Sequence, residues 1–251
     1  LHHAVYRILY PFFDKTFVAG SYSCRLGKGT HKALNRLRTF GNRVSKNHTK
    51  TAWVLKCDIR KFFANINHEI LMCVLTEYIP DKDILWLLQN IIESFSVNLS
   101  GAGLPLGNLT SQLFVNIYMN EFDQFVKHKL RARYYIRYAD DFVIFSRDRN
   151  RLETQRSLIR GFLHDYLKLE LHPHKVSIET VASGVDFLGW VHFPDHRVLR
   201  TTTKRRMFKR ITQYPTQEVG ASYLGLLKHG NTFLLQKHVW SIFHNQLNMQ
   251  D

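Results

Sequence analysis

The chain has 251 residues, 45% of them hydrophobic, so it can bury a sizeable core, and this composition excludes an intrinsically disordered protein. Lysine and arginine outnumber aspartate and glutamate by 35 to 20, a net charge of +15 that is the electrostatic signature of a nucleic-acid binder. No apolar run is long enough to span a bilayer, and the three cysteines show neither disulfide nor zinc spacing. We therefore expect a cytoplasmic protein with no membrane partner.

The first residues already follow an amphipathic helical pattern without a preceding N-cap, which indicates that the sequence begins inside a longer protein. The expected apolar side of this helix consists of Val5, Ile8, Leu9 and Phe12. A basic, glycine-punctuated loop over residues 21–30 precedes a second helix, for which Thr30 is the expected N-cap. The nearly continuous apolar stretch Thr51–Asp58 then predicts a buried strand.

The middle of the chain is predicted to be mainly helical. Helices are expected after Asn67 as N-cap and over residues 81–94, 109–130 and 151–167. A glycine-rich loop is expected over residues 100–107, and strands over 175–179 and 185–192. The region from Arg197 to Arg210 contains only basic charges, and helical patterns follow it, so we place a domain boundary near Arg200.

The most informative stretch is Tyr138-Ala139-Asp140-Asp141. Aromatic and β-branched residues on both sides of it predict two strands joined by a tight turn that carries two carboxylates. Two carboxylates about 4 Å apart repel each other by roughly 4 kcal/mol at an effective dielectric constant of about 20. A bound Mg²⁺ ion removes this repulsion. The alternative is a solvated turn that happens to be acidic.

A third acid, Asp58, ends the predicted buried strand. A strand ending in an acid, followed by helices and by an acidic hairpin, indicates an α+β fold with converging carboxylates. In-line phosphoryl transfer by two metal ions about 3.5–4 Å apart requires such an arrangement.

Together these motifs resemble those of a reverse transcriptase. They occur in the same order as in that family and extend over nearly the whole chain. Tyr138–Asp141 matches the signature hairpin, and Asp58-Ile59-Arg60-Lys61-Phe62-Phe63 matches the strand that supplies the first metal-binding acid. Phe187-Leu188-Gly189-Trp190 resembles the primer-grip hairpin, and Lys175 stands where the family has a lysine near the triphosphate.

The resemblance implies a right-hand polymerase fold of the α+β class, with a palm antiparallel sheet packed on helices, partial fingers and a small helical thumb. The expected domains are residues 1–57 as partial fingers and entry to the palm, 58–198 as the palm with finger-palm helices 68–94, and 199–251 as the thumb. The family's fingers begin with strands upstream of this sequence. The implied activity is RNA-directed DNA synthesis from deoxynucleoside triphosphates on a template RNA and a primer, with two Mg²⁺ ions, or Mn²⁺ in their place.

The resemblance also implies roles for single residues. Asp58 and Asp140 would bridge both metal ions, with Asp141 as a third ligand and the Ile59 carbonyl assisting. The nucleotide would contact Phe63, Leu106, Gly107 and Lys175. In that set, Phe63 would exclude a ribose 2′-hydroxyl and Lys175 would stabilise or protonate the pyrophosphate. Template and primer would contact Arg25, Lys28, Gln112, Leu188, Gly189, Lys204, Arg205 and Lys209. The alternatives are a core phenylalanine at 63, an ordinary solvated lysine at 175, and a solvated helix face over 197–210.

One loop resembles a narrower group, the reverse transcriptases of diversity-generating retroelements. In Gly103–Gln112, Leu106 stands where most of the family has a glutamine and Gln112 where it has a proline. That group is bacterial or phage-encoded, misincorporates opposite template adenines, and works with a small basic accessory protein. An apolar Leu106 cannot hydrogen-bond the incoming nucleotide, which fits low fidelity, although Leu106 could instead pack the loop. The rival functions are a retron or group II intron-type reverse transcriptase, a palm-type nucleotidyl cyclase and a non-catalytic RNA-binding scaffold.

Overall fold

The computed structural model describes residues 1–94 and 101–247, and the chain divides after Ile178 into two compact units. Ser100, at the start of the expected glycine-rich loop, and residues 248–251 of the expected thumb lie outside the described residues. The division falls well before the boundary expected near Arg200. It groups the strands after residue 184 with the C-terminal helices.

The first unit is built around a sheet whose edge strand, Ser177–Thr180, extends two residues past the division at Ile178. Within the described residues its order is β2-β3-β1-β4. The strands are β1 (Trp53–Asp58), β2 (Tyr135–Tyr138), β3 (Asp141–Ser146) and β4 (Ser177–Thr180). β3 pairs antiparallel with both β1 and β2, which confirms the predicted buried strand and the predicted hairpin. The flanked position of β1 explains why its sequence is almost continuously apolar.

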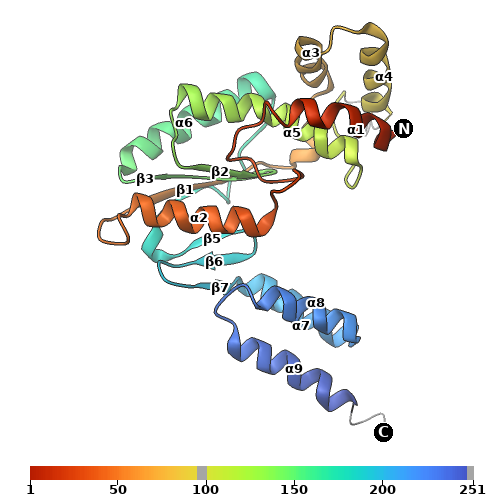
Figure 1. Ribbon diagram of the computed structural model, residues 1–251. Helices are drawn as coiled ribbons and strands as arrows, with labels where there is room; N and C mark the ends of the chain where they lie inside the picture. Colours follow the sequence, from red (N-terminus) through yellow and green to blue (C-terminus); the bar gives the residue numbers. More distant parts are fainter. Residues whose placement is uncertain (95–100, 248–251) are drawn as a thin grey trace. The chain divides into compact units, whose positions relative to one another are not determined.

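The two faces of this sheet have different partners. Alternate residues of β1 and β3 point into the main hydrophobic core, namely Leu55, Cys57, Phe142 and Ile144. Helix α6 (Arg149–Leu167) covers this core-facing side, and α2 (Thr30–Val44) lies on the opposite side (Figure 1). Helix α5 (Leu109–Gln124) contributes Phe122, whose ring centroid lies 4.9 Å from that of Phe142. The core-facing side is thus sealed by helices, and the strand ends remain to carry polar groups.

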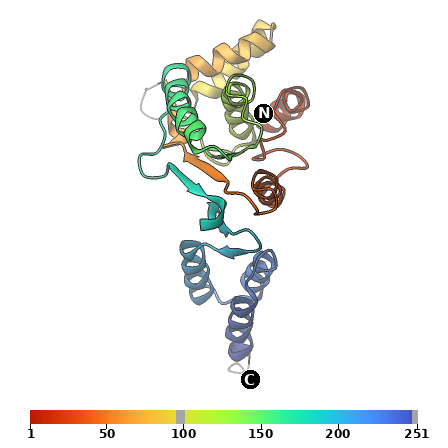
Figure 2. The same cartoon turned by 90° about the vertical axis from the view of Figure 1, so that its left-hand side faces the viewer.

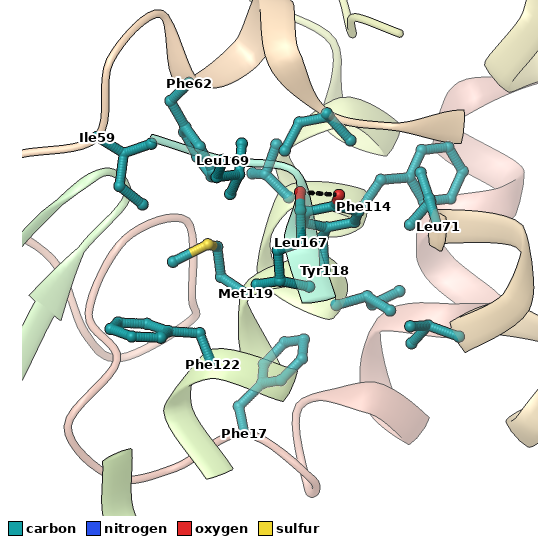
Figure 3. Close-up of a cluster of buried hydrophobic side chains, with 14 of the residues drawn as sticks. Phe17, Ile59, Phe62, Leu71, Phe114, Tyr118, Met119, Phe122, Leu167 and Leu169 are labelled. Carbon is teal, nitrogen blue, oxygen red and sulfur yellow. Dashed lines mark hydrogen bonds between the residues drawn. The ribbon is translucent and has the colours of Figure 1, made fainter. Parts of the chain in front are cut away.

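The core of the first unit is dense in aromatic and aliphatic side chains (Figure 3). Phe114, Tyr118 and Phe122 of α5 lie at its centre and are at most 1% exposed. The Tyr118 hydroxyl donates a hydrogen bond to the Leu167 carbonyl over 2.6 Å, which satisfies the polar atom inside an apolar environment. Burial raises the pKa of Tyr118, so this hydroxyl stays protonated.

Short helices complete the first unit. They are α1 (His2–Phe13), η1 (Phe62–Asn65), α3 (His68–Tyr78), α4 (Lys82–Glu93) and the π-helical η2 (Phe125–Lys129) that continues α5. Helices α3 and α4 pack against each other (Figure 2). The Asn67 side chain accepts from the Ile70 N–H as the predicted N-cap of α3, and Asp81 caps α4.

Two local predictions were wrong. Ile8 and Phe12 of α1 are 72% and 48% exposed, and the helix buries Val5, Leu9, Tyr10 and Phe13 instead. Thr30 makes no capping hydrogen bond, because Gly29 is the N-cap of α2 and the Thr30 hydroxyl donates to the Tyr138 hydroxyl. In both cases the local sequence pattern was compatible with either of two neighbouring residues, and contacts with distant parts of the chain determined which one was used.

The second unit begins with a small sheet and ends in helices. Within the described residues the sheet order is β5-β6-β7, with β5 (Val185–Phe187), β6 (Trp190–His192) and β7 (Arg197–Leu199) antiparallel. The helices are α7 (Thr201–Gln213), α8 (Gln217–Leu227) and α9 (Phe233–Leu247), and α8 packs against α9. The basic run 197–210 begins as a strand, because Val191 pairs with Val198 across β6 and β7, and a helix face is therefore possible only for its later part in α7.

None of the described helices is both long and apolar enough to cross a membrane. Cys24, Cys57 and Cys73 are all free thiols. This agrees with the absence of paired cysteine spacing in the sequence.

Candidate active site

The acids that the sequence analysis singled out come together at one end of the sheet. In the register of β1 and β3, Asp58 lies directly opposite Asp141. The Ile59 N–H, one residue further, donates to the Asp140 carbonyl over 3.3 Å. The end of β1 therefore lies against the turn of the β2–β3 hairpin, although more than eighty residues separate them along the chain.

Strand register also decides which face these carboxylates occupy. Residues opposite each other in an antiparallel pair point to the same face, and successive residues point to opposite faces. Because Phe142 points into the core, Asp141 and its partner Asp58 belong to the face away from the core. Tyr138, which is also paired with Asp141, belongs to the same face. The site is thus a polar edge on the outer face of an otherwise apolar sheet.

Lys175 joins this group from the loop before β4. Its ammonium donates to Oδ2 of Asp58 over 3.0 Å, with the Asp58 side chain 11% and the Lys175 side chain 54% exposed. Burial and then the negative charge of Asp58 raise the pKa of Asp140, while Lys175 acts to lower it. Asp58 and Asp140 are therefore close enough to repel each other, and Lys175 partly offsets this repulsion.

A buried polar cluster holds the hairpin in place beneath the site. The Arg137 guanidinium bonds to both carboxylate oxygens of Asp123 on α5, with Nη2 to Oδ2 at 2.7 Å. The Tyr135 hydroxyl donates to the same carboxylate over 2.6 Å. Arg137 also donates to the Ser21 hydroxyl and to the Ala139 carbonyl in the hairpin turn. It therefore fixes the turn that carries Asp140.

The sequence analysis missed this cluster. The signal available was an arginine at a core-facing position of an apolar strand, together with two acids, Glu121 and Asp123, near the end of the apolar helix α5. A buried charge requires a partner of opposite sign, so the arginine and one of these acids could have been paired on that ground.

The donor chemistry of the site fits a hard divalent cation. Carboxylate and carbonyl oxygens are the ligands that Mg²⁺ prefers. The pKa of Asp140 is raised by burial and by the charge of Asp58, and a bound cation would stabilise the ionised form of such a carboxylate. The Ile59 carbonyl would serve as a ligand on the edge where its N–H meets the hairpin turn. The described residues contain no group of three His, Cys, Asp or Glu side chains already arranged around a metal position. The three-acid ligand set therefore stays a prediction.

The predicted nucleotide-binding residues lie in the same unit. Phe63 is half-buried and meets the ring of the fully buried Phe62 edge-on, with centroids 5.4 Å apart. Leu106 is 77% exposed, so the alternative in which it packs the loop is wrong. Gly107 follows with φ at +100°, a conformation that side-chain-bearing residues rarely adopt.

The predicted template- and primer-binding residues fall into distinct classes. The Arg25 side chain is 6% exposed and donates to Asp14 and to backbone carbonyls, so it holds its own loop in place. Lys28 donates to the Ala19 carbonyl, and Gln112 is half-buried in the first turn of α5. Leu188 and Gly189 form the two-residue turn between β5 and β6, both with positive φ. Lys204, Arg205 and Lys209 are exposed cations on α7, as are Arg206 and Arg210.

Comparison with known protein families identifies the family of this chain. Residues 1–192 match the family described as reverse transcriptase (RNA-dependent DNA polymerase). The chain belongs to the reverse transcriptase family. The matched range contains β1, the acidic hairpin and the Lys175 loop, which are the elements that form the candidate site.

Individual relatives are distant. The chain is 26% identical to protein YkfC of Escherichia coli over 90% of this chain and 68% of that protein. It is 24% identical to the group II intron-encoded protein LtrA of Lactococcus lactis over 83% of this chain and 44% of that protein. The chain thus spans less than half of LtrA.

Solved telomerase structures share the fold of this reverse transcriptase. The telomerase of Candida tropicalis in complex with a telomeric RNA fragment matches 99% of this chain and 46% of its own, with a TM-score of 0.58 and 14% identity. The telomerase of Candida albicans matches 97% and 44%, with a TM-score of 0.59. This confirms the predicted α+β polymerase fold. The assignment of fingers, palm and thumb to particular residues stays a prediction.

Proposed function

We propose that the protein copies a template RNA into complementary DNA through a metal-dependent centre formed by Asp58, Asp140 and Asp141. The observation that carries the proposal is the register that places Asp58 opposite Asp141 and beside the Asp140 turn. Family membership supports the reaction class, and the net charge of +15 suits an RNA or DNA partner.

Different residues of the chain would have different roles in nucleotidyl transfer. Asp58, Asp140 and Asp141 would hold two Mg²⁺ ions, or Mn²⁺, which when bound neutralise charge on the reacting phosphate and activate the attacking oxygen. Lys175, whose ammonium lies 3.0 Å from Asp58, would donate a proton to the pyrophosphate that leaves. Phe63 would limit the space beside the sugar, and the exposed cations of α7 would contact backbone phosphates of template and primer.

A finer proposal concerns fidelity. The exposed, apolar Leu106 offers the nucleotide no hydrogen bond, which supports error-prone synthesis opposite template adenines as in diversity-generating retroelements. On this proposal the protein is bacterial or phage-encoded and cytoplasmic, and it works with a small basic accessory protein.

The rival function is that of a group II intron-type or retron reverse transcriptase. It is favoured by the resemblance to LtrA, a group II intron-encoded protein. A non-catalytic RNA-binding scaffold is less well supported, because it has no need of converging carboxylates.

Primer extension on an RNA template tests the proposal directly. We expect the full protein to incorporate deoxynucleotides only with Mg²⁺ or Mn²⁺, and Asp140→Asn to abolish incorporation while RNA binding persists. Asp165→Asn, at an acid whose side chain is 67% exposed on α6, is the matched control and should retain activity. Incorporation by Asp140→Asn would refute the site. Sequencing the products separates the two subclasses, because only the first predicts errors concentrated at template adenines.

A further inference from the structure

A cavity of about 550 Å³ lies in the first unit at the end of the sheet opposite the carboxylates. Phe145 and Ser146, at the far end of β3 from Asp141, form part of its wall. Five residue steps of about 3.3 Å place this wall roughly 17 Å from Asp141. The cavity is therefore separate from the candidate active site.

The cavity is strongly basic. Six cationic side chains line it, and all are exposed: Arg43, Lys46, Arg131, Arg133, Arg147 and Arg151. Among the described residues none of the six forms an ion pair with a carboxylate. The only acid in the wall, Asp148, instead accepts from the N–H groups of Asn150 and Arg151 as the N-cap of α6. The positive charge is thus left for a ligand.

Two of these cations occupy unfavourable backbone conformations. Lys46 and Arg131 have φ values of +51° and +49°, in the left-handed region. A non-glycine residue there costs roughly 1 kcal/mol or more, which glycine would avoid. Basic side chains therefore stand at two positions where the backbone conformation favours glycine.

Aromatic surface accompanies the charge. Tyr134 lines the cavity half-buried, with the Arg133 guanidinium 5.5 Å from its ring centroid and Phe40 edge-on at 5.3 Å. Arginine forks bind phosphate oxygens in pairs, and tyrosine and arginine planes stack on unpaired bases. An acidic protein segment would satisfy the charge but would leave the ring without a stacking partner.

We infer that this cavity is a second RNA-binding site, which takes the phosphodiester backbone and an unpaired base of a single-stranded or looped RNA segment. The inference does not depend on the proposed polymerase activity. It requires only that RNA contacts this end of the sheet.

The test compares two triple variants of the full protein that remove the same charge. The cavity variant is Arg43→Gln, Arg131→Gln and Arg147→Gln. The control variant is Arg7→Gln, Lys15→Gln and Lys82→Gln, at exposed cations outside the cavity. Thermal melting first confirms that both variants are folded.

Binding of a labelled single-stranded RNA is then measured over a range of salt concentrations. For three lost phosphate contacts, the slope of log K against log salt should become shallower by about 2 in the cavity variant. It should stay near the wild-type slope in the control variant. RNA carrying 5-iodouridine should form a photo-crosslink to Tyr134 in the wild type, and the yield should fall in the cavity variant only.

Equal salt slopes for the two variants, or crosslinks that avoid Tyr134, would overturn the inference. A poly-glutamate chain of equal charge that displaces the RNA from Tyr134 as efficiently as unlabelled RNA does would also overturn it, in favour of an acidic protein partner.

Discussion

Arg137 and Asp123 form an ion pair whose side chains are 1% and 0% exposed, with Nη2 and Oδ2 2.7 Å apart. The same guanidinium donates to the Ala139 carbonyl over 3.1 Å. Helix α5 is thereby connected to the turn of the acidic hairpin, so a buried charge pair supports the backbone from which Asp140 projects.

Removing one partner of this pair should be strongly destabilising. Asp123→Ala would leave the Arg137 charge and the Tyr135 hydroxyl without their acceptor, and we expect a loss of about 3–5 kcal/mol in the free energy of unfolding. Urea denaturation measures this loss. The control is Glu153→Ala, which breaks the solvent-accessible pairs with Arg149 and Arg156 and should cost about 1 kcal/mol. Similar losses for the two variants would contradict the role given to Arg137.

Asp140→Asn should stabilise the metal-free protein at neutral pH. Burial and the charge of Asp58 raise the pKa of Asp140 in the folded state above its ordinary value of 3.8, so its ionised form opposes folding. When the pKa of a group is higher in the folded state than in the unfolded state, its protonation favours folding. This contribution to stability is complete below the pKa of the unfolded state, and it is lost as the pH rises through the pKa of the folded state. The melting temperature of the variant should therefore exceed that of the wild type at pH 7, and the difference should shrink toward pH 4. A constant difference would rule out this electrostatic cause.

Addition of Mg²⁺ should reverse the order of the melting temperatures of the wild type and Asp140→Asn. A ligand that binds only the folded state raises stability in proportion to RT ln(1 + [L]/Kd). We expect the wild type to gain melting temperature on addition of Mg²⁺ and Asp140→Asn to gain much less, as measured by differential scanning fluorimetry. Asp165→Asn should respond like the wild type, and a full response by Asp140→Asn would place the ion elsewhere.

Lys175→Gln tests the role of the ammonium beside Asp58. Loss of a general acid reduces the chemical step by about 10²-fold or more, and without the Lys175 charge the pKa of Asp140 rises further. Single-turnover extension should therefore slow, and the acid limb of the pH–rate profile should move to higher pH. Lys82→Gln, at an exposed lysine on α4, should change neither. If Lys175 is only a solvated lysine without a catalytic role, Lys175→Gln should leave both the rate and the pH–rate profile unaltered.

Phe63→Ala should relax sugar discrimination. If the half-buried ring limits the space for a 2′-hydroxyl, its removal should raise kcat/KM for ribonucleotides relative to deoxynucleotides by roughly 10- to 100-fold. Phe62→Leu is the control, because that ring lies in the core and its loss should lower stability without changing selectivity. Unchanged discrimination in Phe63→Ala would make Phe63 a purely structural residue.

Leu106→Gln should raise fidelity at template adenines, because it restores a group able to hydrogen-bond the nucleotide. Sequencing of extension products measures the error spectrum. Leu26→Gln changes a leucine of nearly equal exposure, 75% against 77%, and should leave the spectrum as it is. An identical spectrum for Leu106→Gln would remove the physical argument for the error-prone subclass.

The sequence alone determined the features that depend on short-range chemistry. The apolar run of β1, the hairpin around Tyr138–Asp141 and the N-cap Asn67 were all predictable, because strand propensity, turn chemistry and capping act over a few residues. The three candidate acids could be named for the same reason, since each ends a strand or occupies a turn.

Tertiary structure alone decided which distant groups meet. The register of Asp58 with Asp141, the pairing of Arg137 with Asp123 and the basic cavity around Tyr134 all join segments far apart in the chain. The wrong choices at Ile8 and Thr30 have the same origin. Side-chain burial and charge pairing are energies of contact, and contacts between distant segments exist only once the backbone has brought them together.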